Sequence, residues 1–118
     1  MLRRSLKEIP SNNYLKDLIE DLERLIDKLI DCYKPLRIIL AGSLAEGKFV
    51  RGLSDIDLLI ITSNIEASID RFIVHNVEDV DVEVTIVTED ELREALELNR
   101  DFYVRALNKG IVLYSRDN

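Results

Sequence analysis

The sequence contains a single cysteine, Cys32, and no apolar run long enough to cross a membrane. One cysteine cannot form a disulfide within the chain, so a disulfide scaffold is excluded. A bilayer-spanning helix needs about 20 consecutive apolar residues, and the N-terminal MLRRSLKEIP also lacks the apolar segment of a signal peptide. We therefore expect a cytoplasmic protein with no membrane partner.

Positive charge is also scarce, with 16 Lys and Arg residues against 23 Asp and Glu residues and a pI near 4.7. Proteins that hold nucleic acid non-specifically carry a basic surface, so we do not expect such binding. Internal repeats, linkers and low-complexity segments are missing from the sequence. A chain of 118 residues that is 47% hydrophobic and 33% charged is therefore predicted to form one domain, residues 1–118, with a packed core.

Apolar periodicity predicts four helices that alternate with four strands. An amphipathic helix over about 12–34, capped by Ser11 or Asn12 and stopped by Pro35, is followed by a core over about 36–115. The core elements are predicted as a strand at 36–41, a short helix at 45–50, a strand at 55–62, a helix at 64–76, a strand at 80–88, a helix at 89–108 and an edge strand at 111–115. This order predicts an α/β or α+β fold with a small mixed sheet of about four strands flanked by helices.

The apolar stripe of the first predicted helix has two interpretations. It can pack on the sheet, or it can form a seam with a partner or with a second copy of the chain, because its spacing also suits a short coiled coil. Cys32, near the end of this helix, is expected to pack as a small hydrophobic residue.

Two carboxylates stand at the start of an apolar strand, in the stretch Ser54-Asp55-Ile56-Asp57-Leu58. Residues two apart on a strand point to the same side, so Asp55 and Asp57 can converge on one ion. Two ionised carboxylates beside an apolar sheet repel each other unless a divalent cation balances them, and Mg²⁺ prefers such oxygen ligands. The alternative is an ordinary strand entry, in which Asp55 caps a turn and Asp57 faces solvent.

Two further features favour the ligand-binding interpretation. Gly42 and Ser43 end the preceding strand, where glycine permits a close approach of the backbone to a ligand and serine presents a hydroxyl and an amide. Asp81 and Glu83 form a second acidic pair on the polar side of a later strand.

Taken together, Gly42-Ser43, Gly47 and Ser54-Asp55-Ile56-Asp57-Leu58 resemble the signature of the nucleotidyltransferase superfamily that includes polymerase beta. The short chain resembles the minimal nucleotidyltransferases (MNT proteins) of archaea and bacteria, and the resemblance covers about residues 36–88. It implies a nucleotidyltransferase fold that uses ATP or another nucleoside triphosphate and two Mg²⁺ ions.

The resemblance also implies roles for individual residues. Asp55 and Asp57 would bind the metal ions, the Gly42-Ser43 turn would hold the triphosphate, and Ser54 belongs to the same signature. A third carboxylate on a later strand would complete the site. Either Asp81 or Glu83 can supply it, and we choose Glu83 because its distance from Thr88 resembles the family spacing.

Glu46 departs from the resemblance, because many minimal members carry arginine just before this glycine. Lys48 or Arg51 on the following loop can substitute for the missing cation, and the alternative is that both are solvated surface charges. His75, the only histidine, is expected as a solvated residue at the polar end of a helix rather than as a catalytic base.

The implied reaction is attack of an acceptor hydroxyl on the α-phosphate of a nucleotide, with transfer of a nucleoside monophosphate such as AMP and release of pyrophosphate. The acceptor hydroxyl can belong to a partner protein. The alternative is a non-catalytic or weakly catalytic antitoxin-like module that restrains an all-helical HEPN-type toxin.

Overall fold

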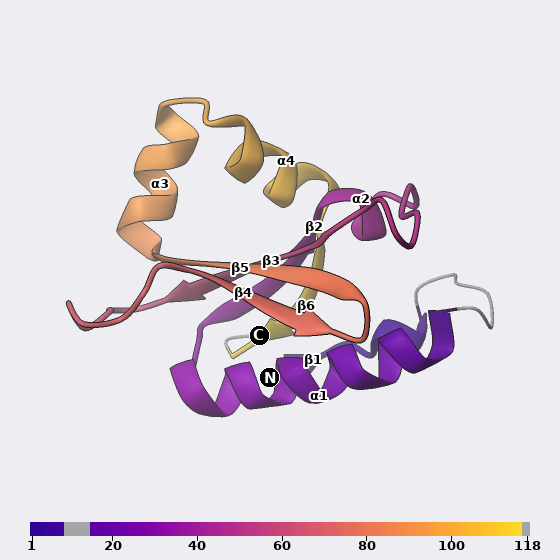
Figure 1. Cartoon of the computed structure of the whole chain (residues 1–118). Coiled ribbons are helices and arrows are strands. Elements are labelled where there is room, and N and C mark those ends of the chain that lie inside the picture. The colour runs from indigo at the N-terminus through magenta and orange to yellow at the C-terminus, as the bar shows by residue number, and fades with distance from the viewer. Residues whose placement is uncertain (9–14, 117–118) are drawn as a thin grey trace.

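The computed structural model describes residues 1–8 and 15–116, whose strands form one six-stranded sheet (Figure 1). The elements are β1 (Leu2–Arg3), η1 (Leu6–Glu8), α1 (Lys16–Tyr33), β2 (Arg37–Ala41), α2 (Gly42–Ala45), β3 (Ile56–Thr62), β4 (Phe72–Val77), β5 (Val80–Thr88), α3 (Glu89–Glu97), α4 (Asp101–Lys109) and β6 (Ile111–Ser115). The mixed sheet flanked by helices is confirmed, with six strands in place of about four. The expected caps of the first helix, Ser11 and Asn12, lie outside the described residues.

The strand order is β1-β6-β2-β3-β5-β4, and only β3 and β5 pair in parallel. Helix α1 lies on one face of the sheet, and α3 and α4 lie on the other (Figure 1). Alternate residues of β3 therefore serve different cores. Ile56, Leu58 and Ile60 pack on the α1 side, whereas Leu59 and Ile61 pack against α3 and α4.

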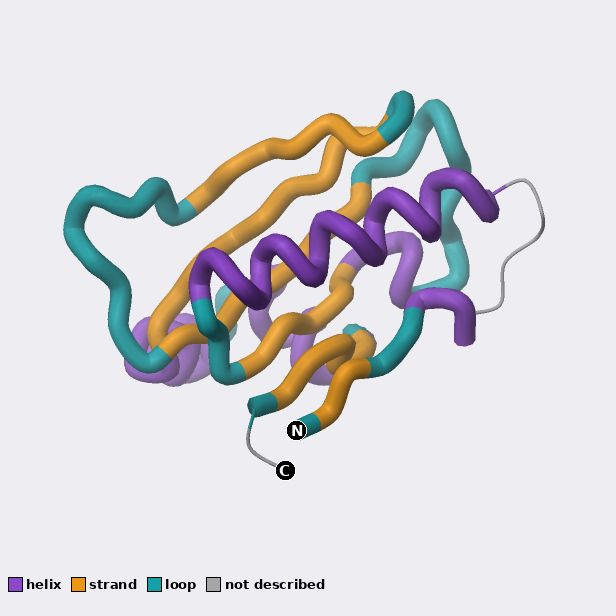
Figure 2. Tube along the Cα trace, turned by 90° about the horizontal axis from the view of Figure 1, so that it is seen from below, coloured by secondary structure: helices purple, strands orange, loops and turns teal. Residues whose placement is uncertain are grey.

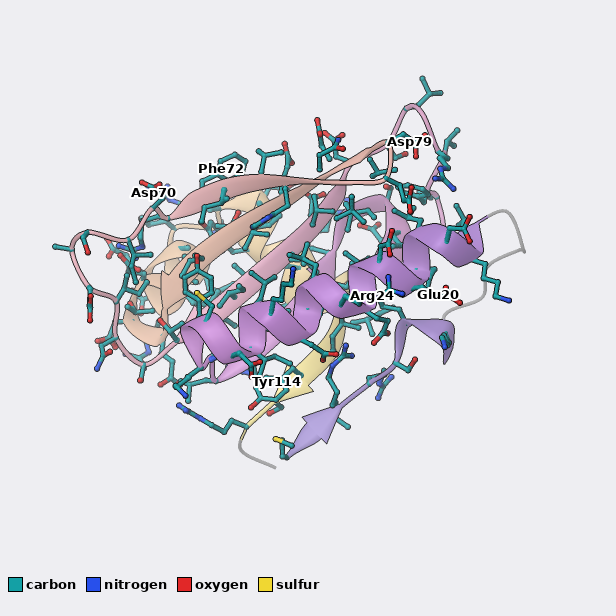
Figure 3. The ribbon with its side chains drawn as sticks, turned by 60° about the horizontal axis from the view of Figure 1, so that its bottom comes forward. Glu20, Arg24, Asp70, Phe72, Asp79 and Tyr114 are labelled. Carbon is teal, nitrogen blue, oxygen red and sulfur yellow. The ribbon has the colours of Figure 1, made fainter. Side chains whose placement is uncertain are left out.

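Helix α1 crosses one face of the sheet (Figure 2). Its apolar stripe is turned toward the sheet. Its buried residues are Leu18, Ile19, Leu22, Ile26 and Leu29. The stripe is thus part of the core, while Arg24, Asp27 and Lys28 are exposed. Arg24 is labelled in Figure 3. Cys32 is exposed, so its prediction as a buried hydrophobic residue is wrong.

The predicted helix at 64–76 is wrong, because residues 72–77 form strand β4 at the edge of the sheet. Their sequence, FIVHNV, is rich in β-branched and aromatic residues, and the two-residue turn Glu78-Asp79 joins β4 to β5 in a hairpin. Glu78 takes a positive φ of 57°, as such a turn requires. His75 consequently lies on a strand and not at a helix end.

Three further boundaries differ from the sequence prediction. The short helix begins earlier, at Gly42–Ala45, and the helix predicted over 89–108 divides into α3 and α4 around Asn99, whose φ is 54°. The last strand, β6, lies between β1 and β2 rather than at the edge, because the N-terminal residues Leu2–Arg3 pair with it from outside. Within the described residues, no helix has the length and apolar character needed to span a bilayer.

Candidate functional site

Asp57 and Glu83 lie side by side on the face of the sheet that carries α3 and α4. They occupy matching positions on the parallel strands β3 and β5, and their side chains share a hydrogen bond. Burial, then the hydrogen bond and charge of Glu83, then the charge of Asp55 raise the pKa of Asp57 to about 7.

Asp55 and Ser54 precede β3 on the loop that leads into it. Asp55 is exposed, and its negative charge acts on Asp57 without a direct hydrogen bond between the two side chains. Ser54 is engaged within the loop, where its Oγ accepts a hydrogen bond from the amide of Val50 at 3.0 Å. The structure therefore places Asp55 near the Asp57–Glu83 pair, whereas Ser54 shapes the loop.

Gly42 lies directly against Asp57. Ala41, the last residue of β2, is opposite Asp57 in the antiparallel register, so the turn that follows passes beside the carboxylate. Gly42 has a φ of +71°, and a Cβ atom added to it would lie 2.3 Å from Asp57 Oδ2. Only glycine fits this position, which brings the Gly42-Ser43 turn to the carboxylates as the sequence predicts.

A pocket of about 380 Å³ opens next to this turn, between α2, the loop that follows it and α4. It is lined by Ala41, Gly42, Ser43, Glu46, Lys48, Asp101, Phe102, Arg105 and Ala106. The pocket thus combines the predicted phosphate-binding turn with two cationic side chains.

Of the two candidates for the third carboxylate, Glu83 is the one that contacts Asp57. Asp81 is exposed and accepts a hydrogen bond from Asn76 Nδ2 at 3.2 Å. Asp81 therefore faces the edge strand β4, while Glu83 faces the centre of the sheet.

The donor set of this site consists of carboxylate oxygens, which suit a hard divalent cation such as Mg²⁺. Burial and the neighbouring charges of Glu83 and Asp55 raise the pKa of Asp57, as expected for carboxylates whose negative charge is not balanced by nearby cations. Among residues 1–8 and 15–116, no three His, Cys, Asp or Glu side chains are arranged to hold a metal ion. Asp57 and Glu83 fit an ion whose remaining ligands are phosphate oxygens and water, as is common for Mg²⁺.

Of the two cations named from the sequence, Lys48 lines the pocket and Arg51 does not. Arg51 lies against Asp79 of the β4–β5 turn, with Nη2 2.7 Å from Oδ1. Arg105 of α4 instead reaches Glu46 and lines the pocket beside Lys48. Sequence reasoning missed Arg105 because it lies 59 residues from Glu46, and no motif around it indicates a contact with the site.

The edge strand β4 adds two apolar side chains that the helix prediction also missed. Val74 is opposite Glu83 and Phe72 is opposite Thr85, so both stand on the same side of the sheet as the carboxylates. Phe72 is 56% exposed and Val74 is 49% exposed. An apolar surface therefore borders the acidic pair on the side away from Gly42.

Comparisons with known proteins bear on the family and the fold of the chain. The sequence matches the nucleotidyltransferase domain family over residues 22–113. Among solved structures, the fold is similar to a nucleotidyltransferase-like protein from Exiguobacterium sibiricum 255-15, with a TM-score of 0.55 and 22% sequence identity. That similarity covers 80% of this chain and 33% of the other, so the chain spans about a third of that protein. No match is found among curated proteins. The family match covers most of the sequence and confirms the resemblance to the minimal, polymerase beta-like members: the chain belongs to the nucleotidyltransferase domain family.

Proposed function

We propose that this protein is a Mg²⁺-dependent nucleotidyltransferase that moves a nucleoside monophosphate, AMP from ATP, to an acceptor hydroxyl. The observation that carries the proposal is the Asp57–Glu83 pair held directly beside the Gly42-Ser43 turn. Neighbouring carboxylates with excess negative charge suit a cation, and the adjoining Gly42-Ser43 turn lines a pocket that a phosphate chain could enter.

Each residue has a defined role in the proposed reaction. Asp57 and Glu83, with Asp55 at the strand entry, would hold Mg²⁺, which supplies positive charge to the α-phosphate when bound. The Gly42-Ser43 turn would hold the phosphate chain. The acceptor oxygen bonds to the α-phosphorus, the bond to the β-phosphate oxygen breaks, pyrophosphate leaves, and Glu83 receives the hydroxyl proton.

The test is incubation of the protein with α-labelled ATP and Mg²⁺, with and without proteins that co-purify from its host. Transfer of label to a partner is expected for the parent protein and for Asp81→Asn, and its loss is expected for Asp57→Asn. Because Asp81 is exposed outside the acidic pair, Asp81→Asn controls for removal of one negative charge. Equal labelling by the Asp57→Asn protein would overturn the proposal.

A second candidate function is favoured by the exposed Phe72 and Val74 beside the acidic pair. Apolar side chains on an edge strand are a common contact surface for another protein, here an all-helical HEPN-type toxin. In this case the chain would act as an antitoxin-like module. The two functions separate if Asp57→Asn restrains such a partner as well as the parent does, whereas a Phe72→Ser, Val74→Ser protein does not.

A further inference from the structure

A two-point ion pair joins α4 to the end of α2 at the rim of the Gly42-Ser43 pocket. Arg105 Nε donates to Glu46 Oε2 at 2.8 Å, and Arg105 Nη2 donates to Glu46 Oε1 at 2.6 Å. The Glu46 side chain is only 11% exposed, whereas that of Arg105 is 52% exposed. Both Glu46 oxygens are therefore committed to Arg105, and this contact fixes the plane of the guanidinium group.

The guanidinium group keeps donors that this pair does not use. Arginine has five N–H donors, and Glu46 accepts from two nitrogen atoms on one edge. Within the described part of the chain, Nη1 makes no hydrogen bond. Arg105 therefore presents an oriented donor edge in a pocket that it shares with Gly42, Ser43 and Lys48.

The position of the pocket indicates which part of a nucleotide it would receive. The α-phosphate reacts beside Asp57 and Glu83, and Gly42 touches Asp57, so the pocket on the α4 side of Gly42 receives what extends beyond the reacting phosphate. An aromatic base is disfavoured there, because Phe102 packs edge-on against Tyr103 at 5.2 Å and contributes to the core. Cationic donors and a glycine turn fit phosphate oxygens.

We propose that Arg105 binds the β- and γ-phosphates of the nucleoside triphosphate and that Glu46 is its positioning residue. Arg105 then supplies, from α4, the cation that Glu46 does not provide at its own position. This inference rests on the proposed function. Asp101 also lines the pocket, and its negative charge opposes phosphate binding. Phosphate binding in this pocket therefore depends on Glu46 holding the positive charge of Arg105 where it can offset the negative charge of Asp101.

The test measures the affinities of ATP and AMP in the presence of Mg²⁺ by calorimetric titration. Arg105→Ala is expected to weaken ATP binding about tenfold and to leave AMP binding unchanged, because AMP lacks the outer phosphates. Arg93→Ala is the matched control, since Arg93 pairs with Asp90 on its own helix α3 and its removal changes the net charge equally. Thermal unfolding of each variant checks that it folds.

Three further variants test the position of the charge. Arg105→Lys, which keeps the charge but loses the two-point contact, is expected to bind ATP with intermediate affinity. Asp101→Asn is expected to tighten ATP binding. The double variant Glu46→Arg, Arg105→Ala places a cation directly after α2 and is expected to recover most of the affinity lost in Arg105→Ala.

The outcomes separate this inference from the proposed function. If the parent protein binds Mg²⁺-ATP and Arg105→Ala keeps the same preference for ATP over AMP, the role of Arg105 is refuted and the proposed function stands. A parent protein that binds no nucleotide overturns both. If Arg105→Ala does not fold, the Arg105→Lys and Asp101→Asn variants decide, and unchanged ATP affinity in both refutes the role.

Discussion

Replacing Asp57 by asparagine is expected to stabilise the metal-free protein at neutral and alkaline pH. Asp57 is partly buried beside Glu83, and asparagine offers a hydrogen-bond donor toward Glu83 while removing one charge. A substitution that abolishes the proposed activity would then increase the free energy of unfolding. A substitution that raises stability but removes activity is characteristic of a site whose charges are arranged for a ligand.

The magnitude follows from the pKa of Asp57, which rises from 3.8 to about 7 in the folded protein. Because the folded state binds this proton more tightly, its contribution favours folding below about pH 4 and is lost as the pH rises to about 7. The full shift corresponds to about 4 kcal/mol, and partial solvent screening reduces this to about 2–3 kcal/mol. For a domain of this size, that is a change of about 10 °C in Tm.

Thermal unfolding in EDTA between pH 5 and 8.5 measures the effect. The Tm of the parent protein should fall over this range, whereas that of Asp57→Asn should fall less and lie about 10 °C higher at pH 8. Asp81→Asn, which removes an exposed charge, is expected to follow the parent. The reasoning is refuted if Asp57→Asn and the parent have the same Tm at pH 8, or if their pH profiles run parallel.

Three other substitutions test the described contacts. Gly42→Ala is expected to lower the free energy of unfolding by about 2 kcal/mol or more and to abolish Mg²⁺-nucleotide binding, because its Cβ would meet Asp57 Oδ2. The control Gly47→Ala, with a similar φ of +75° and no atom within 4 Å of the added Cβ, should only strain the backbone. Equal losses of nucleotide binding by the two variants in a titration would contradict this. Thr88→Ala removes the capping box that Thr88 and Glu91 form at the start of α3 and should lower the free energy of urea unfolding by about 1 kcal/mol. Leu22→Ala, at a fully buried position of α1, should lower the free energy of urea unfolding by about 2–5 kcal/mol. The control Arg24→Ala, on the exposed side of α1, should lower it by less than about 0.5 kcal/mol. Similar losses in the two variants would show that α1 contributes little to the core.

Helices and strands with a strong hydrophobic periodicity could be predicted from the sequence, whereas strands that form only by pairing with a neighbouring strand could not. The spacing in α1 and the alternation in β5 located both elements to within a few residues. Strand β4 was missed because its six residues are too few to distinguish a strand from a helix, and it forms by pairing with β5. Strand β1 has two residues and exists only through its contact with β6.

The candidate site divides in a similar way. Asp57 and the acidic pair Asp81 and Glu83 could be proposed from local patterns, because alternation along a strand fixes the side to which each side chain points. The choice of Glu83 over Asp81 came instead from the resemblance to the family. The register between β3 and β5, which places Asp57 opposite Glu83, is a property of the sheet and appears only in the structure. Arg105 was not predictable, since its role depends on how α4 packs against α2.

Strands β3 and β5 use their two sides for different purposes. On one side lie Asp57 and Glu83, and on the other Leu58 and Val84 are fully buried beneath α1. Substitutions on the outer surface of α1 are separated from the carboxylates by the full thickness of the sheet. Evolution can therefore alter that surface and acquire new binding partners there while the chemistry on the opposite side stays unchanged.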